Sequence, residues 1–527
     1  MQKKISLKLL PSEATHETLI KNHIAQSIGE KESAVSGFNI IKRSIDARSK
    51  QPWINLTLQA FIHEPYQARE KQQFAFLDVE KSNHKVIIVG AGPAGLFAAL
   101  KLLESGIKPV ILERGKDVKS RRRDLAILNK QGIVNPESNY CFGEGGAGTY
   151  SDGKLYTRSS KRGDINRILN LFVHFGADDS ILFESHPHIG TNKLPHIITA
   201  ITKKITDCSG EIHFEKKVID LIIKKSKIVG VKTNTGEFIE SDAVILATGH
   251  SARDIFQLVQ SKKILLAFKP FALGVRVEHP QPLIDIAQYH CSNRGAFLPP
   301  ASYSLVEQVD GKGVFSFCMC PGGIIAPAAT APGEVVVNGW SPSKRNNPYA
   351  NSGIVVSIEE KDVQAYKKSG PLAGIFFQQE VEQKAFQSGG GNLAAPAQRL
   401  VDFTENLISA SLPGCSYLPG IHSTALKEVL PEFIHKRLQT AFKEYGKKMP
   451  ARYGGKSFFT NDAVVVATES RTSSPVRIPR NEETLQHPQI KDLYPCGEGS
   501  GYAGGIVSAA MDGEKVASMV AKFLKNG

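Results

Sequence analysis

An α/β fold is the class that this sequence predicts, and three observations support it. Residues 85–90 (KVIIVG) form a short apolar run rich in β-branched residues, residues 93–106 have helical periodicity that ends in a glycine, and residues 108–114 form a second apolar run. This succession predicts a strand–helix–strand unit with two parallel strands. Further short apolar runs at 243–247 and 493–495 predict that the chain returns to the same sheet.

Length and composition set the broad class of the protein. The chain has 527 residues, 41% of them hydrophobic and 22% charged. At about 150 residues per domain this predicts two to four globular domains and excludes a disordered chain or a fibre. The formal net charge of +14 favours anionic partners such as nucleotides, acidic metabolites or RNA.

The cysteines and the apolar runs indicate the compartment. The seven cysteines are odd in number and widely spaced, so we expect reduced thiols rather than a disulfide scaffold. No run reaches the roughly 18 apolar residues of a membrane span, and the start, MQKKISLKLLPSE, has too short an apolar run for a signal peptide. We therefore expect a cytoplasmic protein; its oligomeric state does not follow from the sequence.

Four segments are expected along the chain. Alternating apolar residues at 5–10, a helix at 12–28 and strands at 38–45 and 53–62 predict a small N-terminal α/β domain of the ferredoxin-like kind, followed by a polar connection. Beyond it we expect a Rossmann-like FAD- or NAD(P)-binding domain interrupted by a mixed α+β substrate domain. The boundaries that we expect are 1–80 for the N-terminal domain, 84–265 and 461–527 for the two parts of the nucleotide-binding domain, and 266–460 for the insertion.

A glycine motif, G-A-G-P-A-G, stands where the strand at 85–90 meets its helix. Gly90 allows a tight turn, Gly92 lets a pyrophosphate approach the backbone, and Gly95 allows close packing of the helix. The helix N-terminus faces the phosphate charge. Glu113, at the end of the next strand, is placed to accept hydrogen bonds from a ribose diol, which favours FAD or NAD over a 2′-phosphorylated nucleotide.

Two later segments favour FAD. The strand that ends in Ala247-Thr248-Gly249 and the segment 493–513 supply groups for a cofactor longer than one strand–helix–strand unit can hold. In the second segment we expect Gly497 and Glu498 near the ribityl phosphate. A helix that begins near Gly504-Gly505 would point its positive end at the flavin pyrimidine, where it stabilises the anion of the reduced ring.

With these segments the chain resembles the long bacterial FAD-dependent dehydrogenases, which have the glutathione-reductase-type FAD fold. The residues that carry the resemblance are IIKRSIDAR (40–48), VGAGPAGLFAAL (89–100), ERG (113–115), CFGEGGAGTYSDGKLYTR (141–158), ATGHSARD (247–254), FKPFALGVRVEHPQ (268–281), GGGNLAAPAQRLVDF (389–403), ESRTSSPVRIPR (469–480) and PCGEGSGYAGGIVSAAMDG (495–513). The resemblance implies noncovalent FAD and an oxidoreductase whose substrate the family does not define. One departure is Glu498, where an aspartate is usual.

The motifs and the resemblance together give a set of expected cofactor-binding residues. They are Gly90, Gly92, Pro93, Ala94, Gly95, Glu113, Arg114, Gly145, Gly146, Val218, Thr248, Gly249, Gly497, Glu498, Gly504, Gly505 and Ile506. The glycine-rich run 143–148, with Ser151, Asp152 and Lys154, is expected against the isoalloxazine ring or, alternatively, as a flexible loop.

Other candidates have two interpretations each. Arg121-Arg122-Arg123 could bind pyrophosphate or a substrate carboxylate, but a charge run is more often a solvated helix face. Cys318 and Cys320 could form a redox pair or half of a metal site. On an extended strand, however, their spacing suits a disulfide poorly and no second ligand pair follows, so we expect structural or incidental cysteines and no metal site. A third group could polarise or clamp a substrate, although each member taken alone is more often a surface or hydrogen-bonded residue: His250, Arg253, Arg276, His279, Lys344, Arg345, His422 and Arg471.

The function predicted is an FAD-dependent dehydrogenase or reductase that passes a hydride through flavin N5 to or from a small anionic substrate. No second glycine motif follows a strand, so NAD(P)H could act only as a transient donor; no catalytic side chain is identified. Alternatives are a flavin-dependent tRNA-modifying enzyme and a flavin-binding regulator without turnover. The dispersed basic residues, without interleaved aromatics, argue against nucleic acid as a partner.

Overall fold

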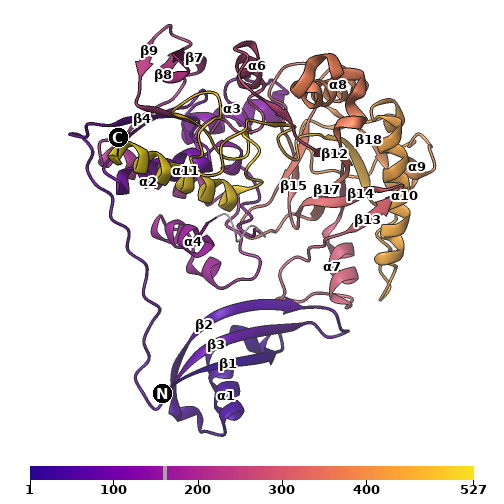
Figure 1. The fold of residues 1–527 in the computed structure, drawn as a ribbon. Helices are drawn as coiled ribbons and strands as arrows, with labels where there is room; N and C mark the ends of the chain where they lie inside the picture. Colours follow the sequence, from indigo (N-terminus) through magenta and orange to yellow (C-terminus); the bar gives the residue numbers. More distant parts are fainter. Residues whose placement is uncertain (158–162, 527) are drawn as a thin grey trace.

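The computed structural model describes residues 1–157 and 163–526, and it has the mixed α/β fold that the sequence predicts (Figure 1). The N-terminal domain is a three-stranded antiparallel sheet in the order β1-β3-β2 with one helix. Its elements are β1 (Gln2–Leu9), α1 (Glu17–Ile28), β2 (Val35–Asp46) and β3 (Trp53–Ile62). Alternate residues of β3 are buried, so one face of the sheet forms the core against α1.

A long segment without helix or strand, residues 63–84, runs from this domain to the rest of the chain (Figure 1). The domain also contacts the rest of the chain directly. The Arg43 N–H donates to the Phe183 carbonyl at 2.8 Å, and the Ser185 N–H donates to the Arg43 carbonyl at 2.9 Å. These backbone hydrogen bonds fix one end of β2 against residues 183–185.

A five-stranded parallel sheet follows, in the order β22-β10-β4-β5-β6. Its strands are β4 (Lys85–Val89), β5 (Lys108–Leu112), β6 (Glu211–His213), β10 (Ala243–Leu246) and β22 (Leu493–Pro495). Apart from Lys85 and Lys108 at their first positions, the central strands β4, β5 and β10 are apolar and buried, because both faces of the sheet are covered. Segments far apart in the sequence thus meet in one sheet, as the sequence predicts.

Each face of this sheet has its own hydrophobic core. Ile88 and Ile245 lie on the face covered by α2 (Pro93–Glu104), α4 (Ile165–His174), α5 (Leu194–Asp207) and α11 (Ile506–Asn526). Ile87 and Val244 lie on the opposite face, against α6 (Arg253–Ser261) and the antiparallel strands β7 (Val218–Lys224), β8 (Lys227–Thr233) and β9 (Phe238–Glu240). Helix α3 (Val118–Gln131) follows β5.

The rest of the chain is organised around a seven-stranded sheet, coloured pink to orange in Figure 1, in the order β13-β14-β17-β12-β20-β18-β19. Its strands are β12 (Phe271–Pro280), β13 (Val306–Val309), β14 (Lys312–Cys320), β17 (Tyr349–Ile358), β18 (Ala395–Arg399), β19 (Ile421–Ser423) and β20 (Val464–Glu469). The helices of this region are α7 (Gln281–Tyr289), α8 (Ala373–Ser388), α9 (Leu400–Thr404) and α10 (Glu432–Lys448), and two strand pairs complete it, β11 (Ala267–Phe268) with β21 (Val476–Arg477) and β15 (Ile324–Pro327) with β16 (Val337–Trp340).

Strand β20 bears on where the inserted domain ends. It pairs with β12 and β18 in the seven-stranded sheet, and the chain rejoins the five-stranded sheet only at β22. We therefore propose that the insertion continues past residue 460, the boundary expected from the sequence, and ends between β21 and β22.

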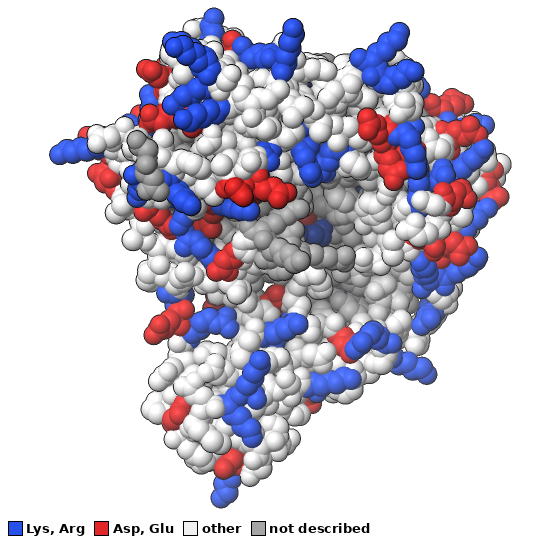
Figure 2. All heavy atoms as spheres, in the orientation of Figure 1, with Lys and Arg blue, Asp and Glu red and all other residues white. Residues whose placement is uncertain are grey.

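The surface shown in Figure 2 carries Lys and Arg interspersed with Asp and Glu, not gathered into one basic patch. Among the helices of the described residues, none combines the length and hydropathy of a membrane span.

Candidate functional site

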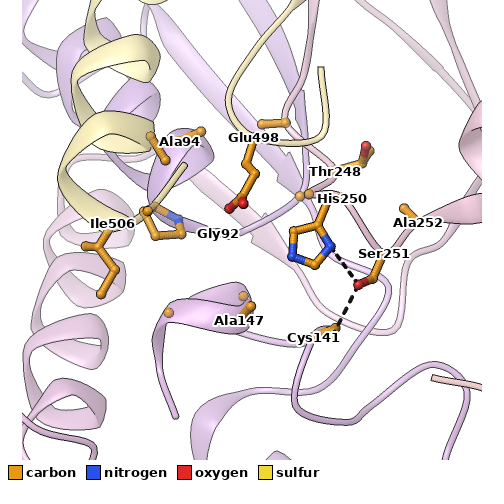
Figure 3. Close-up of a pocket in the computed structure, with 18 of the residues that line it drawn as sticks. Gly92, Ala94, Cys141, Ala147, Thr248, His250, Ser251, Ala252, Glu498 and Ile506 are labelled. Carbon is orange, nitrogen blue, oxygen red and sulfur yellow. Dashed lines mark hydrogen bonds between the residues drawn. The ribbon is translucent and has the colours of Figure 1, made fainter. Parts of the chain in front are cut away.

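A cavity of about 400 Å³ opens at the carboxyl ends of β4, β5 and β10 (Figure 3). Open α/β sheets bind ligands at this edge. The glycine motif lies along one side of the cavity, and residues from the seven-stranded region, including Phe317, Cys318 and Asn338, lie along another. Parts of the chain that are distant in sequence therefore share one site.

Two glycines of the motif are required by the protein's own packing. At Gly90, φ is +108°, and an added Cβ would lie 2.5 Å from the Ala247 carbonyl oxygen. At Gly95, an added Cβ would lie 2.0 Å from the Gly90 carbonyl oxygen. Only glycine lets α2 and β10 approach the turn this closely.

Gly92 differs from both, because the protein itself has room for a side chain there. Its φ is −75°, and the nearest atom to an added Cβ is Gly146 Cα at 3.9 Å. Gly92 is also the N-cap of α2, and as a glycine it has no side chain to cap that helix end. It therefore offers no side-chain acceptor to the first N–H groups of α2, which begin beside the cavity, an arrangement suited to an anionic group.

Glu113 lies at the end of β5 with only 5% of its surface exposed. Its carboxylate accepts three backbone N–H groups, each at 2.9 Å, from Ala91, Gly115 and Gly143. The same side chain lines the cavity. Glu113 therefore ties the glycine turn to the loop at 143, and a carboxylate with about four acceptor positions retains capacity for a ribose hydroxyl.

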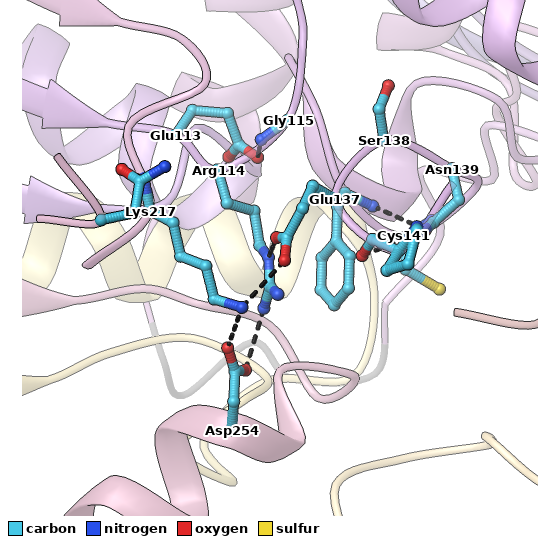
Figure 4. Close-up of polar contacts among 12 residues, drawn as sticks. Glu113, Arg114, Gly115, Glu137, Ser138, Asn139, Cys141, Lys217 and Asp254 are labelled. Atoms are coloured by element: carbon cyan, nitrogen blue, oxygen red, sulfur yellow. Dashed lines mark hydrogen bonds and ion pairs between the residues drawn. The ribbon is translucent and has the colours of Figure 1, made fainter. Parts of the chain in front are cut away.

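A ring of four charged side chains borders the cavity next to Glu113 (Figure 4). Arg114 pairs with Glu137 at 2.6 Å and with Asp254 at 2.9 Å, and Lys217 pairs with the same two carboxylates at 2.8 and 3.0 Å. Burial alone would raise the pKa of both acids, but the Arg114 and Lys217 charges outweigh it and lower both pKa values. The ring joins β5, β7 and α6 at this end of the cavity.

The C-terminal segment lines the cavity beside the loop at 146–148, where an added Cβ at Gly148 would lie 3.4 Å from Ile506 Cγ1 (Figure 3). Helix α11 begins at Ile506, as the sequence predicts, and its N-terminal residues line the cavity. An added Cβ at Gly504 would meet no atom of the described residues within 4 Å. Gly513 lets α11 pack directly on α2, since a Cβ there would lie 2.1 Å from the Ala94 carbonyl oxygen. Two helix N-termini thus meet at one cavity.

Two titratable side chains, Glu498 and His250, reach into this cavity (Figure 3). Burial raises the pKa of Glu498 to about 7, although the Lys269 charge opposes the shift. Burial, with the charges of Arg471 and Arg253, lowers the pKa of His250 to about 4. At neutral pH the imidazole is therefore uncharged, and its Nδ1 lies 3.0 Å from Ser251 Oγ. Ser251 Oγ in turn donates to Cys141 Sγ at 3.4 Å.

The arginine run on α3 separates into a buried and an exposed part. Arg121 is fully buried and donates to the carbonyls of Asn139, Tyr140 and Glu144 at 2.8–2.9 Å, whereas Arg122 and Arg123 are exposed. The interpretation of Arg121 as a ligand-binding residue is wrong, because three carbonyls of the loop occupy its guanidinium. Arg121 instead holds the loop that carries Gly143 into the site.

Most of the expected cofactor-binding residues line the cavity. They are Gly90, Gly92, Pro93, Ala94, Glu113, Arg114, Gly146, Val218, Thr248, Gly249, Glu498, Gly504, Gly505 and Ile506. Gly95, Gly145 and Gly497 lie behind its surface: added Cβ atoms there would meet the Gly90 carbonyl, Thr149 Oγ1 and Ala94 Cβ respectively. These three glycines allow neighbouring elements to pack closely. In the sequence, a glycine with this role looks the same as a glycine that contacts a ligand.

Several candidate substrate-binding residues are occupied elsewhere. Arg276 is fully buried in a pair with Glu469 at 2.7 Å, and the His279 Nε2 lies 2.8 Å from the Phe458 carbonyl. Arg471 lines the cavity but is held by Glu334 and Glu382, each at 2.9 Å. Sequence reasoning missed Phe317 and Asn338, which carry no motif and reach the site only through the fold.

A second cavity, of about 1110 Å³, lies between the N-terminal domain and residues 178–193, 288–302 and 343–345. It adjoins the first, because Asp152 of the first cavity accepts a hydrogen bond from Arg345 of the second at 3.3 Å. Its cationic side chains outnumber its acidic ones: Arg43, Arg48, Lys193, Arg294, Lys344 and Arg345 against Asp46, Asp178 and Glu184.

Comparisons with known families cover nearly the whole chain. Residues 270–472 match a family described as FAD-dependent protein, C-terminal domain-like, and residues 84–266 match pyridine nucleotide-disulphide oxidoreductases. Residues 1–61 match a domain of unknown function. An uncharacterized protein of Clostridium beijerinckii is 37% identical over 524 residues, with 96% of each chain covered.

Solved structures give weaker similarities. A flavin-dependent brominase is 13% identical, with 84% of this chain and 80% of that chain covered and a TM-score of 0.36. A geranylgeranyl bacteriochlorophyll reductase-like protein from Thermoplasma acidophilum is 12% identical, with 84% and 79% covered and a TM-score of 0.35. Scores at this level carry no argument about the reaction.

Proposed function

The chain belongs to the family of long bacterial FAD-dependent oxidoreductases that includes the Clostridium beijerinckii relative, and from this premise we propose that it transfers a hydride to or from a small anionic substrate. FAD is its cofactor, as the sequence predicts. When bound, FAD supplies reversible acceptance of a hydride equivalent, while the protein binds and orients the reactants.

The cavity fits this cofactor at three points. Gly92 and Gly504 leave space that the described residues do not fill, and the N-terminus of α2, which begins at a glycine cap, offers N–H groups to a pyrophosphate. We assign Glu113 to the adenosine ribose and the N-terminus of α11 to the flavin pyrimidine. The single observation that carries the assignment is Gly92, because none of the described residues around it requires the lack of a side chain.

Glu498 and His250 are the groups that we assign to proton handling. Their pKa values are shifted in opposite directions, to about 7 and about 4, by the same buried surroundings. Such divergence separates an acid from a base within one site. Near pH 7 the Glu498 carboxyl can hold or release a proton, while His250 stays neutral and is oriented by Ser251.

The second cavity supports an anionic substrate. Its cationic side chains outnumber its acidic ones, although Arg43, Arg48, Arg294 and Arg345 each pair with a carboxylate, and Lys193 and Lys344 add further positive charge to its lining. The Asp152–Arg345 contact places this cavity next to the cofactor cavity. We propose that the substrate approaches through this space.

The first test is the absorbance spectrum of the purified protein, followed by anaerobic addition of NADH and then NADPH. We expect a flavin spectrum that one of the two bleaches, at a rate that falls as salt is added because the donor is an anion. If neither NADH nor NADPH bleaches the flavin spectrum, the electron donor is another anionic substrate. A colourless protein that FAD does not reconstitute would overturn the proposal.

A second prediction concerns Glu498. Because its pKa is about 7, its carboxyl is mainly neutral below that pH and mainly charged above it. We expect the bound flavin spectrum to change with a midpoint near pH 7 in the wild type and to stay constant over the same range in Glu498→Gln. His250→Gln is the control and should keep the transition. Persistence of the transition in Glu498→Gln would assign it to another group.

A further inference from the structure

A cluster of two cysteines and a lysine lies at the part of the cavity formed by the inserted domain. Lys154 Nζ is 3.9 Å from Cys318 Sγ and 3.8 Å from Cys320 Sγ. Cys318 and Lys154 both line the cavity, and Cys318 is partly exposed whereas Cys320 is buried. One sulfur of the pair is therefore open to a ligand, with a cation beside it.

The local backbone explains how both sulfurs reach one ammonium group. Strand β14 carries one extra residue relative to β17 between Phe317 and Cys320, and Cys318 has a φ of +47°. Because of this bulge, Cys318 and Cys320 do not lie on the regular extended strand that was expected from the sequence. Arg276 Nη1 donates to the Cys318 carbonyl at 3.4 Å and holds the bulge in place.

Lys154 is held in place from its own side. The Leu155 N–H donates to the Pro187 carbonyl at 2.9 Å, and the Ile189 N–H donates to the Gly153 carbonyl at 3.1 Å. Its ammonium also pairs with Asp152 at 3.3 Å. Nearby charges keep the pKa of Lys154 above its usual value despite burial, so the side chain stays cationic.

The charged groups around Cys318 come from several elements. Lys154 and Arg276 are cations, while Asp152, Glu469 and Glu498 are acids that oppose a thiolate. A hydrogen bond from Cys320, together with the two cations, outweighs burial and lowers the pKa of Cys318. The same hydrogen bond and burial raise the pKa of Cys320, so Cys320 keeps its proton and acts as the donor.

We propose that Cys318 is a nucleophilic thiolate of this cavity, ion-paired with Lys154, and that it takes small electrophiles with a carbon–carbon double bond conjugated to a carbonyl group. The sulfur electron pair forms a bond to the β-carbon, and the π pair moves to the carbonyl oxygen. The Lys154 ammonium stabilises that oxygen and delivers a proton to the α-carbon. Water then returns a proton to the Lys154 amine. The addition needs no oxidant and has no leaving group.

The experiment measures alkylation of Cys318 by N-ethylmaleimide in the FAD-loaded protein, from pH 6 to 9, with the modified cysteine identified by peptide mass spectrometry. Below its pKa of about 8.5, an ordinary thiol such as N-acetylcysteine reacts about tenfold faster for each unit by which the pH is raised. We expect Cys318 to react at a nearly constant rate over the upper part of this range. The shape of the profile is the readout, because a lower pKa also reduces the reactivity of the thiolate itself.

Variants distinguish a thiolate that Lys154 stabilises from a thiol that is only exposed. Lys154→Met should move the Cys318 profile to higher pH, Lys154→Arg should restore it, and Cys318→Ser should remove the pH-independent component. Cys318 labelling that rises in parallel with N-acetylcysteine, or a profile that Lys154→Met leaves in place, would overturn the proposal. Mass detection of the adduct does not depend on turnover, so this result is independent of the proposed hydride transfer.

Discussion

Replacing Gly92 with Val is expected to give a folded protein that has lost its FAD. The backbone at Gly92 has φ near −75°, which any residue adopts, and the nearest protein atom to a Cβ is 3.9 Å away. The side chain would instead occupy the space assigned to the pyrophosphate at the end of α2. We expect the Kd for FAD to rise by about 100-fold, or ~2.7 kcal/mol, as measured by fluorescence titration of the apoprotein.

A series at this motif distinguishes cofactor exclusion from misfolding. Gly92→Ala should weaken FAD binding less than Gly92→Val, with a loss of about 1 kcal/mol or less in stability because alanine is a poorer N-cap than glycine. Gly95→Ala should instead lower the thermal stability of the apoprotein. Its Cβ would lie 2.0 Å from the Gly90 carbonyl oxygen and 3.1 Å from Ile88 Cγ2, and these contacts destabilise the fold itself. Full retention of FAD by Gly92→Val would remove the pyrophosphate from this position.

The parts of the site that the sequence predicted are those whose spacing is local. Gly90, Gly92 and Gly95 occupy one strand-to-helix turn, and their roles follow from the geometry of that turn alone. The N-terminus of α11 was also predictable, because a glycine pair precedes a long amphipathic helix. In each case the residue and the element that positions it are adjacent in the chain.

The remaining parts depend on contacts across long stretches of sequence. Arg121 supports the loop at 139–144 from a helix, and its burial could not be read from a run of three arginines. Lys154 meets Cys318 only because the inserted domain packs over the cofactor cavity, and the bulge in β14 has no local signature. Register between strands and packing between domains decide these contacts, and neither can be read from the local pattern of one sequence.

Glu113→Ala is expected to destabilise the protein even when no FAD is bound. Its carboxylate accepts buried N–H groups from Ala91, Gly115 and Gly143, and truncation would leave all three without an acceptor. Since an unsatisfied buried donor costs about 1–3 kcal/mol, we expect a loss of about 3 kcal/mol or more in the free energy of unfolding. Thermal and urea unfolding of the apoprotein measure this effect without the cofactor.

Glu113→Gln makes the same argument quantitative. The amide keeps one oxygen in place for two of the N–H groups and turns an NH₂ towards the third, so its loss of stability should lie between those of the wild type and the alanine variant. FAD binding should fall in both variants, since the ribose contact and the turn that forms the pyrophosphate site are lost together. If Glu113 served the ribose alone, the three apoproteins would unfold at the same temperature and differ only after FAD is added. A graded loss in the apoproteins would instead show that one carboxylate both builds the turn and binds the ligand that the turn receives.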